Sequence, residues 1–237
     1  MKRIAIVPAF NEEGAIGQVI DELRAFDPEL DVVVVDDASQ DATRARAAGR
    51  GAHVVVLPFN LGIGGAVQTG FRYAAENGYD LAIRVDGDGQ HDPAELGPLV
   101  EVVVSDQADI CVGSRFAGAD GYRSSPARRV GIRILARTVS WLTGQRVTDT
   151  TSGFQVLNRK AIELFAADYP HDYPEVEAAL MLHKHRLRLA EVPVTMRERV
   201  AGRSSIRGLR SVYYMAKVML AILIGALRRR TTPLEDT

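Results

Sequence analysis

The chain of 237 residues is long enough to bury one sizeable core, as one large domain or as a domain with an appendage. Its formal net charge is -1, which gives no reason to expect a nucleic-acid partner, and its one cysteine, Cys111, excludes an internal disulfide framework. The apolar run near the N-terminus is too short for a signal peptide, so we expect a cytoplasmic protein with Cys111 as a buried, inert thiol.

Short apolar runs alternate with helical patterns along the chain. The runs rich in Val and Ile predict buried strands at 3–9, 31–37, 52–58, 80–86 and 108–114. Helix faces are predicted between them, formed by Ile16, Ile20 and Leu23, by Val67, Phe71 and Ala74, and by Leu96, Leu99 and Val103. This alternation predicts an α/β fold, with a Rossmann-like, mostly parallel sheet and helices on both faces.

A polar cluster follows each predicted strand. In chain order the clusters are PAFNEE, DDASQD, NLGIGG, DGDGQHD and GSR. The carboxyl ends of parallel strands share one edge of a sheet, and ligands bind beyond that edge. Each cluster alone could be a helix cap or a turn. Together they predict a ligand site.

The fourth cluster is the most acidic. Asp86 and Asp88 are two residues apart, so an extended backbone would point both carboxylates the same way, and Gln90 adds a neutral oxygen. These ligands suit Mg²⁺ or Mn²⁺ with open positions for a diphosphate. We expect His91 to be a solvated loop residue rather than a ligand, and the alternative for the two carboxylates is a solvated turn.

Two later segments are amphipathic or apolar. Residues 125–144 carry Arg129, Arg133 and Arg137 at helical spacing together with Trp141, which predicts a membrane-interface helix; the alternative is an ordinary helix with a solvated arginine face. Residues 212–227 are apolar but shorter than the ~20 residues of a usual span, so we expect them to lie at the interface or dock on a partner.

With these motifs in place, the chain resembles the family 2 glycosyltransferases of the GT-A fold, and among them the dolichyl-phosphate mannose synthase-like polyprenyl-phosphate sugar transferases. The matching motifs keep their order over about the whole chain: PAFNEE, VVDDASQD, NLGIGGAVQTGF, DGDGQH, GSR, DTTSGFQV, YPEVE and RVAGRSS. The resemblance implies a GT-A domain over 1–206, followed by an apolar interface helix and basic tail over 207–237. Ser205 stands where the family often has a lysine.

The resemblance also implies roles for individual residues. The donor would be bound by Pro8, Phe10, Glu12, Asp36, Asp37, Gly64 and Asp86. The metal would be held by Asp86, Asp88 and Gln90. The catalytic residues would be Asp88, Arg115 and Asp149. The acceptor phosphate would be contacted by Arg129, Arg133, Arg203 and Ser204.

The implied reaction is inverting transfer of a sugar from a nucleotide-diphospho-sugar to a polyprenyl phosphate. The enzyme would be peripheral at the inner face of the membrane, with a small membrane protein as a further partner. One alternative is a family 2 transferase that acts on a saccharide hydroxyl in cell-wall or exopolysaccharide synthesis, with Asp149 as the general base. Another alternative is a catalytically silent nucleotide-binding membrane scaffold.

Overall fold

The computed structural model describes residues 1–117, 126–145, 147–149, 151–170 and 174–197, with the backbone alone for 126–132 and 174–176. The strands are β1 (Arg3–Ala9), β2 (Asp31–Asp36), β3 (His53–Val56), β4 (Leu81–Arg84), β5 (Ile110–Ser114), β6 (Gln155–Asn158) and β7 (Leu189–Pro193). The helices are α1 (Ile16–Phe26), α2 (Thr43–Gly49), α3 (Gly62–Glu76), α4 (Leu96–Val104), α5 (Pro126–Thr143), α6 (Arg159–Ala167) and α7 (Pro174–Lys184), with a 3-10 turn at Pro93–Glu95.

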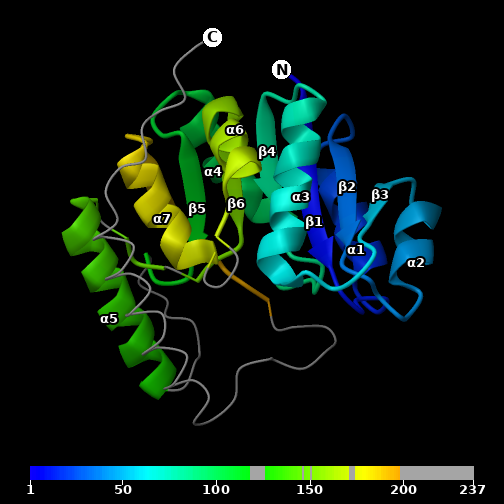
Figure 1. Ribbon diagram of the computed structural model, residues 1–237, viewed down its shortest axis with the longest axis horizontal. Coiled ribbons are helices and arrows are strands. Elements are labelled where there is room, and N and C mark those ends of the chain that lie inside the picture. Colours follow the sequence, from blue (N-terminus) through cyan, green and yellow to red (C-terminus); the bar gives the residue numbers. More distant parts are fainter. Residues whose placement is uncertain (118–125, 146, 150, 171–173, 198–237) are drawn as a thin grey trace.

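The strands form one 7-stranded sheet in the order β3-β2-β1-β4-β6-β5-β7 (Figure 1). Strand β6 runs antiparallel to β4 and β5, and the other neighbouring pairs are parallel. The mostly parallel α/β prediction is therefore confirmed, and the predicted strands correspond to β1 through β5. Strands β6 and β7 were not predicted, because β6 has polar Gln155 and Asn158 at its ends and β7 is half-buried and carries Glu191, so neither shows a long apolar run.

The helices cover both faces of the sheet. One core cluster joins the sheet to α1, α2 and α4, and a second joins it to α3, α6 and α7. Successive side chains of β1 alternate between the two clusters, with Ala5 and Val7 in the first and Ile4 and Ile6 in the second. The three predicted helix faces are all buried, which confirms the layered architecture.

Helix α3 lies very close to the central strand β1. A Cβ atom added at Gly70 would overlap Cγ2 of Ile6, and one added at Gly65 would lie 2.6 Å from Cβ of Leu61. Gly70 therefore allows the helix to approach β1, while Gly65 leaves room for the Leu61 side chain at the start of the same helix. This packing fixes the N-terminal end of α3 beside the carboxyl edge of the sheet.

Helix α5 packs against α7 at one end of the sheet, as Figure 1 shows. Its inner face buries Leu135, Ala136 and Val139, while Ile134 and Trp141 are exposed. The helix begins at Pro126, in agreement with the sequence pattern. Among the described residues, none of the helices is long and apolar enough to cross a membrane.

Other predictions can be placed only in part. Cys111 is buried, as predicted, and burial raises the pKa of its thiol to about 12, with a smaller contribution from Glu191. The predicted boundary at 206, the segment 207–237, Arg203 and Ser204 lie outside the described residues.

Candidate active site

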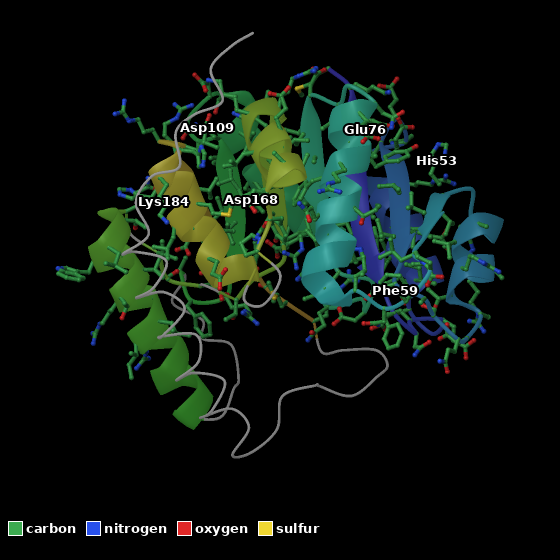
Figure 2. The ribbon with its side chains drawn as sticks, in the orientation of Figure 1. His53, Phe59, Glu76, Asp109, Asp168 and Lys184 are labelled. Atoms are coloured by element: carbon green, nitrogen blue, oxygen red, sulfur yellow. The ribbon has the colours of Figure 1, made fainter. Side chains whose placement is uncertain are left out.

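The residues singled out in the sequence gather at the carboxyl edge of the sheet. Figure 2 shows Phe59, which follows β3, at this edge, whereas Asp109, which precedes β5, lies at the opposite edge. Since β2, β1 and β4 are neighbours, the polar segments that follow these strands lie side by side. The polar segments thus converge at one edge of the sheet, as the sequence predicted.

The loop after β4 is tightly held against the end of β1. The N–H of Gly87 donates to the carbonyl of Pro8 at 3.3 Å, and a Cβ at Gly87 would lie 3.1 Å from that oxygen. Gly89 has a φ of 76°, a left-handed conformation that favours glycine, and the N–H of Gln90 donates to Oδ1 of Asp88 at 3.0 Å. The two glycines therefore shape the loop that presents Asp86 and Asp88.

The two carboxylates differ in exposure. Asp86 keeps 32% of its side chain exposed, whereas Asp88 is 5% exposed. Nη2 of Arg84 lies 3.5 Å from Oδ1 of Asp86, and the backbone N–H of Asp86 donates to Nδ1 of His91 at 3.1 Å. Asp86 is thus the more accessible carboxylate, and its position is held from two sides.

His91 is not the solvated loop residue that we predicted. It is 4% exposed, and its ring stacks on Phe154 with centroids 4.9 Å apart. Burial lowers the pKa of His91 and outweighs the nearby carboxylates Asp86 and Asp88, which act in the opposite direction. The prediction failed because Phe154, which buries the imidazole, is far away in the sequence.

A second group of side chains joins the end of β5 to the segment before β6. Nε of Arg115 donates to Oδ2 of Asp149 at 2.7 Å, and Nη2 donates to Oδ1 at 2.8 Å. The backbone N–H of Arg115 and both the N–H and the hydroxyl of Thr151 also donate to this carboxylate. Burial alone would raise the pKa of Asp149, but these hydrogen bonds and the charge of Arg115 hold it below its ordinary value.

Glu191 on β7 holds the backbone that carries Asp149. Its carboxylate accepts the N–H groups of Thr148 and Asp149 at 2.8 to 3.0 Å, and the hydroxyl of Thr148 at 2.6 Å. The Thr148 hydroxyl also lies 2.8 Å from the hydroxyl of Ser114. The arginine is therefore presented by a rigid network that ties β5, β7 and the segment before β6 together.

Residues 4–165 match the model of the family described as Glycosyl transferase family 2. The chain belongs to this family. An undecaprenyl-phosphate mannosyltransferase of Micrococcus luteus is 33% identical over 224 residues, which cover 88% of each chain. A polyprenol monophosphomannose synthase of Mycolicibacterium smegmatis is 29% identical over 87% of this chain and 82% of its own length.

A solved structure supports the architecture. Glucosyl-3-phosphoglycerate synthase from Mycobacterium tuberculosis, in complex with Mn²⁺, uridine diphosphate and glucosyl-3-phosphoglycerate, matches with a TM-score of 0.71 and 23% identity. The match covers 95% of this chain and 79% of that one. Identity at this level shows the fold alone, and it confirms the GT-A type fold expected for this family 2 glycosyltransferase.

The residues assigned to the donor differ in how they are placed. Phe10 is 45% exposed at the end of β1, and Pro8 is buried in the strand. The backbone N–H of Glu12 donates to the Thr43 hydroxyl at 2.8 Å, which joins this loop to α2. The Asp36 carboxylate is buried beside them and accepts the N–H of Ser39 at 3.2 Å. This group lies next to the loop of Asp86.

Two of the predicted donor residues serve the local structure. The Asp37 carboxylate accepts the N–H of Leu61 at 2.7 Å and that of Gly62 at 2.9 Å, so it anchors the start of α3. Gly64 is buried in the first turn of the same helix. Asp37 therefore holds the start of α3 in place, and contact with a donor would be additional to this function.

The predicted acceptor residues are placed only in part. Arg133 on α5 is exposed, and so is Arg137 one turn further along. Arg129 lies in α5, where only the backbone is described, and Arg203 and Ser204 are outside the described residues. The structure thus brings the residues predicted for the donor and the metal to one edge of the sheet, together with the Arg115–Asp149 pair, and it places the described Arg133 on the exposed face of α5.

Sequence reasoning missed two residues of the site. Arg84 is 1% exposed within β4, and Tyr169, whose hydroxyl accepts a hydrogen bond from Nη1 of Arg84 at 3.1 Å, is also 1% exposed. A lone arginine inside the apolar run LAIRVD was a usable signal, because an arginine at a core position needs a specific partner. Tyr169 gave no comparable signal.

The loop after β4 fits a hard divalent cation. Among the described residues, no three Asp, Glu, His or Cys side chains are gathered closely enough to hold a metal. Asp86, Asp88 and Gln90 nevertheless offer two carboxylates and an amide oxygen on one short loop. Such a donor set suits a cation that takes its remaining ligands from a diphosphate and water, as Mg²⁺ does.

Proposed function

We propose that this family 2 glycosyltransferase transfers a hexose, with inversion, from a nucleoside diphosphate sugar to a polyprenyl phosphate at the cytoplasmic face of the membrane. The Micrococcus luteus relative is named for action on undecaprenyl phosphate, and the Mycolicibacterium smegmatis relative is named a polyprenol monophosphomannose synthase. Both names support a lipid phosphate as the acceptor here. The sugar and the base of the donor are left open.

The observation that carries the proposal is the engagement of Asp149. Both of its oxygens accept hydrogen bonds from Arg115, Oδ1 also accepts two from Thr151, and the pKa of Asp149 lies below the ordinary value. A carboxylate of low pKa is a poor general base, and a sugar hydroxyl needs such a base. A phosphate monoester has a second pKa near ~6, so it is largely dianionic at pH 7 and attacks without one.

The reaction then needs positioning and charge rather than proton transfer. An oxygen of the acceptor phosphate forms a bond to the anomeric carbon, while the bond from that carbon to the diphosphate oxygen breaks and its electron pair leaves with the nucleoside diphosphate. Asp86, Asp88 and Gln90 would hold Mg²⁺ or Mn²⁺, which would supply positive charge next to that leaving group. Asp149 keeps the Arg115 guanidinium oriented, and the guanidinium attracts the phosphate groups.

The exposed face of α5 supports attachment to a membrane surface. Ile134 and Trp141 are two helical turns apart and are 48% and 82% exposed, and Arg133 and Arg137 are exposed beside them. Apolar and aromatic side chains with flanking arginines suit the interface of an anionic bilayer. The apolar segment 212–227 would make a second contact, with the bilayer or with a small membrane protein.

The decisive experiment supplies alternative acceptors to one enzyme preparation. The purified full chain is incubated with Mn²⁺, a panel of labelled nucleotide sugars, and either a short polyprenyl phosphate or an oligosaccharide. Label should partition into the lipid extract, and the rate should change little from pH 7 to 9 because the acceptor is already ionised. Thr151→Val serves as a control. It removes the hydroxyl that donates a hydrogen bond to Asp149 and keeps the Asp149 carboxylate.

Two results would overturn the proposal. Transfer of label only to the oligosaccharide would establish the saccharide-hydroxyl alternative, especially if Asp149→Asn then abolished activity and Arg115→Lys did not. Binding of nucleotide without transfer to either acceptor, at every divalent ion tested, would favour the silent scaffold.

A further inference from the structure

Arg84 is a buried cation next to the most accessible carboxylate of the site. It lies at the end of β4 with 1% of its surface exposed, and an arginine remains protonated even there. A buried charge is stable only when opposite charge and hydrogen-bond partners surround it. Asp86 supplies part of that charge, with Oδ1 at 3.5 Å from Nη2.

The other end of the guanidinium is held by Tyr169. The Tyr169 ring packs on Phe71 of α3 and Phe165 of α6, with centroid distances of 5.6 and 5.1 Å. All three rings are almost completely buried, so the phenol has little freedom to move. Its oxygen accepts a hydrogen bond from Nη1 of Arg84 at 3.1 Å, and the ring cluster thereby fixes where the guanidinium lies.

The backbone just before β6 also lies against Arg84 and Asp86. A Cβ added at Gly153 would lie 2.9 Å from Nη2 of Arg84 and equally close to both Asp86 oxygens. Such a contact is too short for a real Cβ, so only glycine allows this approach. On the far side, Nε2 of His91 lies 3.9 Å from Oδ2 of Asp86. The carboxylate is therefore approached by Arg84 and His91 from its own segment and by Gly153 from the segment before β6.

We propose that Arg84 is a positioning residue that orients the Asp86 carboxylate toward a divalent cation and its diphosphate, and that Tyr169 positions Arg84. The inference rests on the proposed function, because it assumes that Asp86 binds the metal. Groups that orient a metal ligand fix its geometry and so raise affinity for the ion. The packing between α3 and α6 thus determines how the metal is held.

The test measures binding of Mn²⁺, with and without uridine diphosphate, by the electron paramagnetic resonance signal of the free ion. Arg84→Lys keeps the charge and removes the planar fork, and Tyr169→Phe removes one hydroxyl. Replacing a group that orients a metal ligand usually costs about 10- to 100-fold in metal affinity or activity, and we expect Arg84→Lys in that range. Tyr169→Phe, one hydrogen bond further away, should lose about three- to tenfold.

Tyr79→Phe is the matched control. Tyr79 is also buried, and its hydroxyl donates to Oδ2 of Asp31 at 2.8 Å near the opposite edge of the sheet. Both tyrosine variants should lower the melting temperature by similar amounts, but only Tyr169→Phe should weaken Mn²⁺ binding. Gly153→Ala, which keeps every charge and hydroxyl, should also weaken it.

Several outcomes would overturn the inference. Equal Mn²⁺ affinity in the wild type and in Tyr169→Phe would do so. A loss of Mn²⁺ affinity in Tyr79→Phe as large as that in Tyr169→Phe would also do so, because it would indicate a general effect of lowered stability. Absence of Mn²⁺ binding by the wild type, alone and with uridine diphosphate or any other nucleoside diphosphate, would remove the role of Asp86 itself. Because this assay uses no acceptor, failure of transfer to polyprenyl phosphate would refute the proposed function and leave this result standing.

Discussion

The exposed face of α5 offers the sharpest test of membrane attachment, because Trp141 is the only tryptophan of the chain. Its fluorescence therefore reports on one known position. On addition of anionic vesicles, the emission of Trp141 should shift to shorter wavelength as the indole leaves water. Neutral vesicles should give a smaller shift at low salt, since the neighbouring Arg133 and Arg137 would lack anionic headgroups.

The size of the effect follows from the exposure of the side chain. Trp141 is 82% exposed, and an indole side chain of about 200 Å² would transfer about 160 Å² at about 25 cal/mol per Å², or about 4 kcal/mol if fully inserted. Half insertion at an interface gives about 2 kcal/mol, which corresponds to about a 30-fold loss of partitioning for Trp141→Ser. Each of Arg133→Gln and Arg137→Gln should cost about 1 kcal/mol.

Flotation with vesicles measures the variants, since Trp141→Ser has no fluorophore. Val104→Ser is the control, because Val104 is also an exposed apolar side chain, at 49%, but lies at the end of α4. It should float like the wild type. If the wild type floats while its emission does not change, or if Trp141→Ser floats as well as the wild type, α5 is not the membrane contact.

Three further predictions concern the site, the ion pairs and the packing. Asp88→Asn should abolish transfer, as excess chelator should, while circular dichroism stays unchanged; activity in either case would refute the metal role. Burial alone would raise the pKa of Asp109, but hydrogen bonds from Arg188 outweigh it and lower the pKa. The stabilisation that ionised Asp109 gives to the fold is therefore present above pH ~4 and is lost as the pH falls through the pKa of the folded state. The free energy of unfolding of Asp109→Asn, measured in urea, should therefore depend less on pH below ~4 than that of the wild type. Gly70→Ala should destabilise by about 1–3 kcal/mol because its methyl group overlaps Ile6, and an unchanged urea midpoint would contradict this.

The parallel part of the fold could be predicted because each of its strands is an apolar run between turn signals. The clusters after those strands could be predicted for the same reason, since parallel strands place their carboxyl ends on one edge. Contacts between distant segments could not be predicted. His91 was expected in solvent, yet Phe154 buries it, and no local pattern in DGDGQHD indicates this partner.

The sequence pattern also could not predict the role of each individual polar residue. Asp36 and Asp37 are adjacent in VVDDASQD, and the pattern treats them alike. In the structure Asp37 anchors the start of α3 through the N–H groups of Leu61 and Gly62, while Asp36 accepts only one described backbone hydrogen bond, from Ser39. Which of two neighbouring carboxylates is engaged depends on the direction each side chain takes at the end of β2.

The antiparallel strand β6 explains how the two halves of the site meet. Because β6 runs opposite to its neighbours, the residues that precede it lie at the carboxyl edge of the parallel strands. Gln155 is paired with Arg84 of β4 on one side and with Val112 of β5 on the other. The segment before β6, described at 147–149 and 151–154, therefore enters between the ends of these two strands. A parallel strand in this place would have left the segment at the opposite edge. Its Asp149 then reaches the arginine that follows β5, and its Gly153 reaches the carboxylate that follows β4. One reversal of strand direction thus joins the residues proposed for the metal to the Arg115–Asp149 pair.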